Sequence, residues 1–238
     1  MRYTFLLLVL LGLAACNDPN APDFIKSAGS TQTVERTVPG AIRRLLVEDD
    51  VEIELVQGLE HIEVTAPRNE LPKVHTDYAD GLLTIRNRNT FQWVRAYRPI
   101  RVRVPLDSLT DLEQRGFGYI HSTDTLHAAS LRIAVYGAAD LRLNAATNAL
   151  ALDLNGQGKL TLAGRTSYAY TALRKYAQLD AYDLQTRLAD VEQDGAGDAR
   201  ITISDSVHIR QKGPGCLLLG GRPRLGTDPG AQPCIRYR

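Results

Sequence analysis

The chain has 238 residues and a formal net charge of +1, with 28 basic and 27 acidic residues. Its length suits one large domain or two small ones, and the balanced charge gives no field that would attract nucleic acid or an anionic membrane surface. Hydrophobic residues make up 44% and charged residues 23% of the chain, which excludes wholesale disorder and a collagen-like repeat.

The N-terminus is typical of a bacterial export signal. Arg2 precedes an apolar run from Phe5 to Leu13, which is shorter than the roughly 20 residues needed to span a bilayer. The Leu-Ala-Ala-Cys sequence ending at Cys16 resembles a lipobox, which implies cleavage after residues 1–15 and a lipid on the Cys16 sulfur. The alternative is an ordinary signal peptide that is followed by an unrelated cysteine.

Residues 16–34 form a polar stretch that is rich in turn-forming residues. Asn, Asp and Pro follow Cys16 directly, and no sustained apolar period begins before about Val34. We therefore expect a flexible linker between the lipid and the folded domain.

Strand patterns begin after this linker. Apolar and charged residues alternate with a period of two in Val51–Leu55, in His61–Val64 and in Ile100–Val104. One apolar and one charged face are what a half-buried strand requires. Turn-forming pairs such as Asp80-Gly81 separate these runs, so we expect an all-β fold.

The second half of the chain is repetitive. Five glycine-led units begin at Gly116, Gly137, Gly156, Gly195 and Gly213. The spacings between these glycines are 21, 19, 39 and 18 residues, and the spacing of 39 places a degenerate unit near Arg174–Leu179. A unit of about 19 to 20 residues holds two short strands and two turns, and it buries its apolar face only by stacking on its neighbours.

This repeat predicts a right-handed parallel β-helix-like solenoid, into which the N-terminal strands continue as part of the same domain. The alternative is an antiparallel sandwich with regularly spaced turns. The order of the motifs resembles the putative auto-transporter adhesin, head GIN domain family. The elements that carry this resemblance are Gly81–Ile85, Trp93, Ile100–Leu106, the five glycine units and Gly220–Pro223.

The resemblance covers residues 35–223 and implies a β-helical domain, with residues 224–238 as a C-terminal tail. The family is typically bacterial and lipoprotein-like. Its adhesin label rests on analogy, and no reaction is established for it. The resemblance therefore implies a binding or structural module and no catalysis.

The residues do not contain a familiar catalytic motif. Gly-x-Ser-x-Gly, His-Glu-x-x-His, Cys-x-x-Cys and a phosphate-binding loop are missing, and the Gly-x-Gly pairs lack the third glycine of a dinucleotide site. His121, Asp124 and His127 come nearest to a site, but polar residues on an exposed turn are the default explanation for them. We expect no metal and no cofactor. The competing hypothesis is an envelope carbohydrate-active enzyme with paired carboxylates in a solenoid groove.

An insertion before Ile100 combines four arginines with three aromatic residues. Its candidate ligand-binding residues are Arg88, Phe91, Trp93, Arg95 and Tyr97. Arginine forks and aromatic faces suit anionic or sugar ligands and nucleic-acid bases. Nucleic acid fits an exported, nearly neutral chain poorly, which leaves a glycan or a protein as ligand. We favour a simpler explanation over ligand binding, namely an extended hairpin whose aromatic residues cover the end of the solenoid and whose arginines stay hydrated.

Two cysteines remain once Cys16 carries a lipid. An exported compartment permits a disulfide between Cys216 and Cys234, which would tie the tail to the last repeat and cover an exposed strand edge. Free thiols are the alternative. The sequence as a whole predicts a lipid-anchored module of the bacterial cell envelope, at the outer membrane, with end-to-end association of copies left open.

Overall fold

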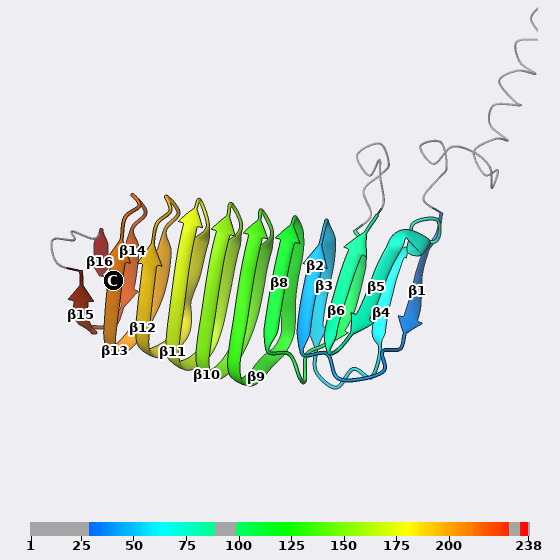
Figure 1. Cartoon of the computed structure of the whole chain (residues 1–238), viewed down its shortest axis with the longest axis horizontal. Helices are drawn as coiled ribbons and strands as arrows, with labels where there is room; N and C mark the ends of the chain where they lie inside the picture. The colour runs from blue at the N-terminus through cyan, green and yellow to red at the C-terminus, as the bar shows by residue number, and fades with distance from the viewer. Residues whose placement is uncertain (1–28, 89–98, 229–233, 238) are drawn as a thin grey trace, which may run out of the picture.

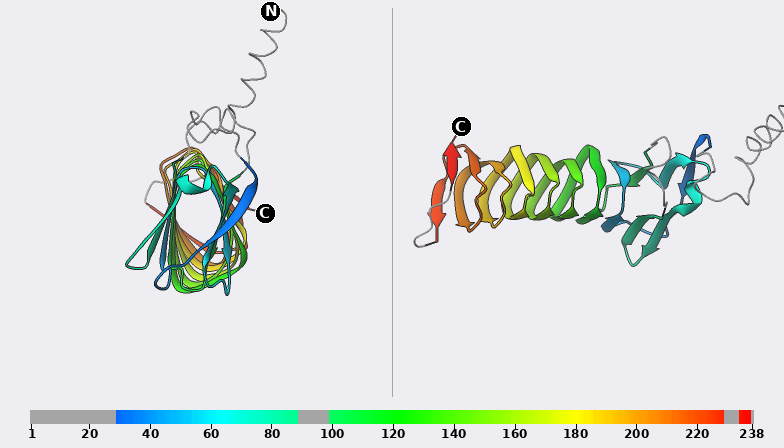
Figure 2. Two further views of the ribbon diagram at one scale, coloured as in Figure 1. Left: turned by 90° about the vertical axis from the view of Figure 1, so that its right-hand side faces the viewer. Right: turned by 90° about the horizontal axis from the view of Figure 1, so that it is seen from above.

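A computed structural model describes residues 29–88, 99–228 and 234–237. Sixteen strands join in one sheet that winds around a single axis as a β-solenoid (Figure 1, Figure 2). The coils of its body pair in parallel, which confirms the expected fold class and excludes the antiparallel sandwich. No helix in these residues is long and apolar enough to cross a lipid bilayer.

Each coil of the body is one long, bent strand. These strands are β9 (Gly118–Gly137), β10 (Asp140–Gly156), β11 (Lys159–Lys175), β12 (Gln178–Gln193) and β13 (Ala199–Gln211). Because neighbouring coils pair in register, Leu131 lies beside Leu150, and Leu150 lies beside Ala169. One sequence period is therefore one coil, as the repeat predicts.

The coil has one glycine-rich corner and one bend, in place of the two turns expected from the sequence. The strand continues through the bend because its backbone keeps pairing with the neighbouring coils, as residues 145–147 of β10 do with residues 164–166 of β11. Buried threonines line the inside of the bend, and the Thr147 and Thr166 hydroxyls are hydrogen-bonded to each other at 3.0 Å.

Ladders of aliphatic side chains fill the interior, one residue from each coil. One ladder consists of Leu131, Leu150, Ala169, Ala189 and Val207, all buried. A single coil has no core of its own, so its apolar side chains leave water only when the next coil stacks on them. The stability of the body therefore depends on the contacts between coils.

The N-terminal strands add two coils, and these stack out of chain order. They are β2 (Arg44–Glu48), β3 (Val51–Val56), β6 (Leu82–Asn87), β7 (Arg101–Pro105) and β8 (Asp111–Gly116). Strand β2 pairs in parallel with both β6 and β8, and β3 pairs in parallel with both β7 and β9. The coil formed by β2 and β3 therefore lies between the later β6–β7 coil and the body, and the N-terminal strands continue the same solenoid.

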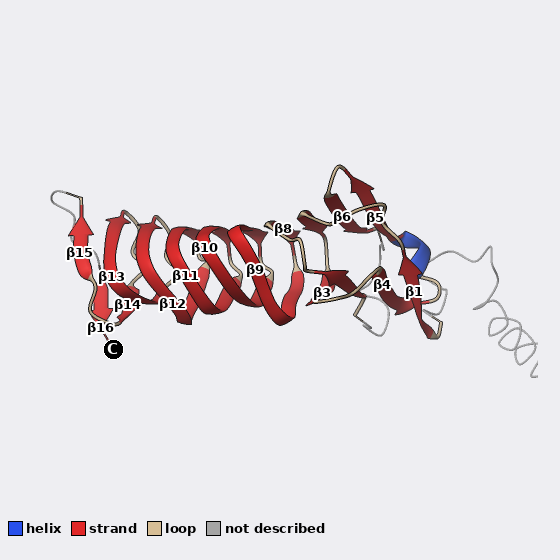
Figure 3. Ribbon diagram, turned by 90° about the horizontal axis from the view of Figure 1, so that it is seen from below, coloured by secondary structure: helices blue, strands red, loops and turns tan. Residues whose placement is uncertain are grey.

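Antiparallel strands close the N-terminal end of the solenoid, beside a short 3-10 helix (Figure 1, Figure 3). These elements are β1 (Thr31–Arg36), β4 (Ile62–Pro67), η2 (Leu71–Lys73) and β5 (Val74–Ala79). Strand β5 pairs with β6, β4 pairs with β7, and β1 pairs with β4. Residues 31–34 of the expected linker thus lie in β1.

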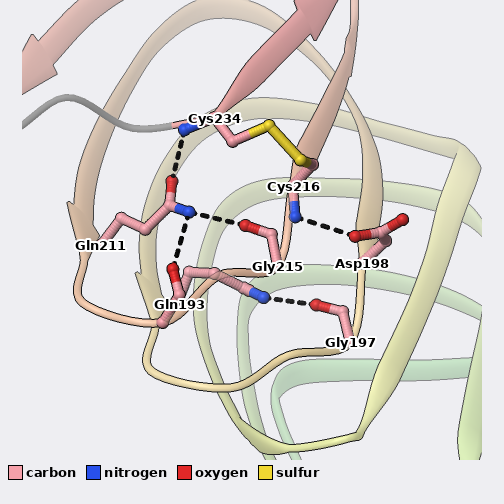
Figure 4. The surroundings of a disulfide bond; sticks show 8 residues. Gln193, Gly197, Asp198, Gln211, Gly215, Cys216 and Cys234 are labelled. Carbon is pink, nitrogen blue, oxygen red and sulfur yellow. Dashed lines mark hydrogen bonds between the residues drawn. A yellow bond between two sulfur atoms is a disulfide. The ribbon is translucent and has the colours of Figure 1, made fainter.

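Three short strands form the C-terminal end: β14 (Leu217–Gly220), β15 (Arg224–Thr227) and β16 (Ile235–Tyr237). Strand β15 pairs with β13 and β16 pairs with β14, so the expected tail provides strands of the last coil. A disulfide joins Cys216 to Cys234 (Figure 4). The Gln211 side chain fixes the same corner, because it accepts a hydrogen bond from the Cys234 N–H at 2.9 Å and donates one to the Gly215 carbonyl at 2.6 Å.

Candidate functional site

The corners of successive coils stack into one row along the solenoid, which we call the corner edge. The middle residues of these corners are Phe117, Ala138, Gln157, Tyr176, Ala196 and Pro214. Backbone hydrogen bonds join neighbouring corners: the Gln157 N–H donates to the Gly137 carbonyl at 2.7 Å and the Tyr176 N–H to the Gly156 carbonyl at 2.9 Å. The row is therefore held by the main chain and presents its side chains outward.

The first residue of each corner stacks on a carbonyl group of the coil before it. A Cβ on Gly156 would lie 1.8 Å from the Gly137 carbonyl oxygen, which explains why glycine recurs here. Lys175 pairs with Gly156 and takes the glycine position of the fourth corner, with a left-handed φ of 58°. This places the degenerate unit where the spacing of the glycines predicts it.

A hollow of about 540 Å³ lies on the corner edge, and we call it the corner groove. Its lining consists of Gly116, Phe117, Tyr136, Gly137, Ala138, Asn155, Gly156, Gln157 and Lys175. The small residues at the second and third corners form the hollow, and Phe117, whose exposed fraction is 65%, stands at the first corner. Tyr176, at 63% exposed, follows Lys175 at the fourth corner.

The groove combines an aromatic face, amide groups and one cation. The Lys175 side chain is exposed, and its ammonium group makes no ion pair or hydrogen bond with the part of the chain that the structure describes. The Tyr136 hydroxyl donates a hydrogen bond to Asp153 at 2.8 Å, and chiefly this bond raises the pKa of Tyr136, so its phenol stays neutral. The buried Oδ1 atom of Asn155 has no hydrogen-bond partner among the described residues.

The structure describes only the margins of the predicted insertion. Arg88 is exposed, and its N–H donates to the Lys73 carbonyl at 3.0 Å. Phe91, Trp93, Arg95 and Tyr97 lie outside the described residues. So does Cys16.

The strands on either side of the insertion end and begin at the corner edge (Figure 1). The Asn87 side chain donates a hydrogen bond to the Asp50 carbonyl at 3.1 Å, which ties the end of β6 to the next corner. The Glu52 N–H donates to the Ile100 carbonyl at 2.9 Å on the other side of the gap. The insertion therefore leaves and rejoins the solenoid at the edge that carries the corner groove.

The histidines that sequence analysis singles out are not brought together as a site. The His121 ring stacks on Tyr119 with their centroids 5.2 Å apart, and His127 is exposed. The Asp124 carboxylate accepts a hydrogen bond from the Gln57 N–H at 3.2 Å. Within residues 29–88, 99–228 and 234–237, no group of three or more His, Cys, Asp or Glu side chains is arranged to hold a metal ion.

A second concentration of polar side chains covers the outer face of the last coils. The Tyr170 hydroxyl donates to Glu192 at 2.8 Å and the Arg210 guanidinium donates to the same carboxylate at 3.0 Å. These two bonds lower the pKa of Glu192. The general acid of a glycosidase needs a raised pKa so that it keeps its proton. The lowered pKa of Glu192 favours the ionised carboxylate instead, which does not suit that role.

A hollow of about 470 Å³ lies on the same face, against the last coil. Tyr168, Asp190, His208 and Arg224 contribute to its lining. The Tyr168 hydroxyl donates to Asp190 at 2.5 Å, the His208 ring lies 3.5 Å from an Asp228 oxygen, and Arg224 is paired with Asp205 at 2.7 Å. The polar groups here are partnered with one another, unlike Lys175 and Asn155 in the corner groove.

Comparison with known protein families shows which family the chain belongs to. The family model described as "Putative auto-transporter adhesin, head GIN domain" matches residues 43–223, well over half of the 238 residues. The chain belongs to the head GIN domain family. No curated protein matches its sequence.

Solved structures share the head GIN fold at low sequence identity. A putative adhesin from Bacteroides fragilis superposes with a TM-score of 0.75 at 16% identity, over 83% of this chain and 93% of that one. A putative adhesin from Parabacteroides distasonis gives 0.63 at 16% identity, over 88% and 95%. A protein from the same species, described as a putative lipid binding protein, gives 0.60 at 14% identity, over 88% and 94%. At these identities the likeness establishes the fold.

Sequence reasoning misses the corner groove. It interprets the glycine units as turns and assigns no role to the residues between the glycines. One signal is present: the fourth unit has a lysine where the other units have glycine. Only the register of β10 and β11 brings this lysine beside Gly156, and so next to Asn155 and Gln157.

Proposed function

We propose that this head GIN domain is a lipid-anchored, non-catalytic, adhesin-like binding module of the bacterial cell envelope, and that its corner edge holds the ligand. The corner groove is the observation that carries the proposal. It joins the exposed Phe117 ring, the exposed Gln157 amide and the unpaired Lys175 ammonium group, all from described residues, on a scaffold of main-chain hydrogen bonds. Solvent-accessible hollows with a few convergent polar groups are typical ligand sites. The adhesin description of the family supports the same interpretation.

The anchor is the second part of the proposal. Residues 1–15 serve as a signal peptide, Cys16 carries the lipid, and residues 16–34 lead to the solenoid, which residues 35–223 form. We place the protein at the outer membrane. Labelling of cells with a clickable palmitate analogue tests this: the wild type takes up label and floats with membranes, and Cys16→Ala does neither. Equal labelling of both proteins would contradict the anchor.

The insertion is the third part of the proposal. We propose that Arg88, Phe91, Trp93, Arg95 and Tyr97 contribute to a glycan or protein ligand site, because the insertion leaves and rejoins the solenoid at the corner edge. Nucleic acid is not an expected ligand, since an exported chain with 28 basic and 27 acidic residues offers little phosphate attraction. Light scattering of the purified protein can measure whether copies associate end to end.

A screen against immobilised glycans and matrix proteins tests the binding function. We expect the wild type to bind at least one class of ligand, and both Phe117→Ala and the pair Trp93→Ala with Arg95→Ala to weaken that binding at least tenfold. Tyr237→Ala is the matched control, because Tyr237 is also an exposed aromatic residue, at 55%, but lies in β16. Unchanged binding by Phe117→Ala would show that the ligand lies elsewhere.

A further inference from the structure

We infer that the corner groove binds an acidic glycan, a polysaccharide of sugar acids, with the sugar carboxylate held by Lys175. The inference rests on the proposed function and names the ligand class of the same site. Charge, hydrogen bonding and shape each point to this class.

The charge of the groove selects an anion. Lys175 is the one lining residue with a full charge, and no acidic residue is among those that line the groove in the described part of the chain. The neighbouring arginines are already engaged: Arg174 pairs with Asp153, and Arg115 pairs with Glu113. An ammonium group without a partner gains most from a ligand carboxylate, because a charge-assisted hydrogen bond is stronger than a neutral one.

The backbone of Lys175 adds a second observation. Its φ of 58° lies in the left-handed region, at the position that glycine occupies in the other corners. A residue with a Cβ atom is strained in this conformation, because the Cβ atom lies close to the following carbonyl oxygen. A strained position at a concave surface is a pointer to function, and here the strained residue is the one that supplies the cation.

The remaining lining groups match the rest of a sugar acid. The exposed Gln157 side chain carries an amide group that can donate a hydrogen bond to a sugar hydroxyl and accept one from it. Phe117 and Tyr176 expose their rings three corners apart, and with strands about 4.8 Å apart the rings are separated by roughly 14 Å along the axis. Aromatic faces at this spacing can each cover the C–H face of a different pyranose ring in one polymer.

A peptide fits the groove less well. A peptide that binds by adding a strand to a sheet gains affinity from main-chain hydrogen bonds to a free strand edge. The corner N–H groups are already bonded to the coil before them, as those of Ala138 and Gln157 are to the carbonyls of Gly116 and Gly137. Recognition at this edge must come from side chains, which favours a ligand with many hydroxyl groups of its own.

Affinity electrophoresis and calorimetry with polygalacturonate, and with the same polymer as its methyl ester, test the inference. We expect the wild type to bind the acid at least tenfold more tightly than the ester, and raised salt to reduce that preference. Lys175→Gln should bind both polymers equally weakly. Lys212→Gln, which removes the same charge from an exposed residue of the edge outside the groove, should bind like the wild type.

Lys175→Gly keeps the fold with less strain, so it distinguishes loss of the cation from loss of structure, and we expect it to lose the preference as well. Equal binding of acid and ester by the wild type would overturn the acidic-glycan inference while leaving the proposed function intact. Binding of a matrix protein, or of phosphatidylglycerol vesicles, without any polymer would also overturn it. Binding that Phe117→Ala leaves unchanged would overturn the groove as the site. Failure to bind any probe would count against both proposals.

Discussion

Lys175 lies directly beside Gly156 in the parallel register of β10 and β11, and the two residues occupy equivalent corners in different backbone conformations. Lys175 has a φ of 58°, whereas a Cβ on Gly156 would lie 1.8 Å from the Gly137 carbonyl oxygen. One corner has accepted a side chain by rotating its backbone, and the other has no room for one.

Replacement of Lys175 by glycine is expected to stabilise the protein. The left-handed conformation costs a lysine about 1 to 2 kcal/mol, and part of this gain is offset by the greater freedom of an unfolded glycine, which leaves a net gain of about 0.5 to 1 kcal/mol. Urea unfolding measures it. Lys212→Gly is the control, because Lys212 is not among the residues with positive φ. This variant should lose about 0.5 to 1 kcal/mol of stability. A destabilised Lys175→Gly would contradict the assigned strain.

Replacement of Gly156 by alanine is expected to be strongly destabilising, because the new Cβ would collide with the main chain of the preceding coil, which cannot move alone. We expect a loss of about 3 kcal/mol. Gly58→Ala separates the two costs of such a change: Gly58 has a φ of 69°, and a Cβ added there would meet no heavy atom within 4 Å, so only the conformational cost of about 1 kcal/mol applies. Equal losses for both variants in urea unfolding would refute the steric account.

Loss of the disulfide is expected to release the last coil. Cys216 and Cys234 are separated by 18 positions, and closing a loop of this size contributes about 3 kcal/mol in the chain-entropy model. Strand β16 pairs with β14, and the Leu217 N–H donates to the Cys234 carbonyl at 2.8 Å. Hydrogen exchange of the pair Cys216→Ser with Cys234→Ser should therefore quicken in β14 and β16 and stay unchanged in β10. Unchanged exchange in β14 would contradict a stabilising role.

The Tyr168 hydroxyl is expected to lose its proton at a higher pH than an ordinary tyrosine. Its hydrogen bond to Asp190 is the main cause that raises the pKa of Tyr168 to about 12. The unfolded chain loses this proton near pH 10, so the contribution of Tyr168 to stability is complete below pH 10 and is lost as the pH rises to about 12. Ultraviolet titration of tyrosinate, taken as the difference between wild type and Tyr168→Phe, measures the pKa. In Asp190→Asn the midpoint should fall toward about 10, and an unchanged midpoint would assign the shift to another cause.

Much of the architecture was open to prediction from the sequence. The recurrence of glycine and the period-2 alternation depend on local sterics and on the burial of one face, so the units starting at Gly116 and Gly213 already specify stacked coils. The expectation of a second turn in each unit was wrong, because a strand whose hydrogen bonds go to its neighbours can curve without a breaking residue, as residues 145–147 do.

The sequence by itself determined the solenoid, its period and the degenerate unit around Lys175, because these follow from repeats that any reader of the chain can count. The tertiary structure decided the stacking of β6 and β7 outside β2 and β3, and the meeting of Phe117, Asn155 and Lys175 in one groove. Those residues are 38 and 20 positions apart in the chain. Only the parallel register makes them neighbours, and register is set by the packing of whole coils.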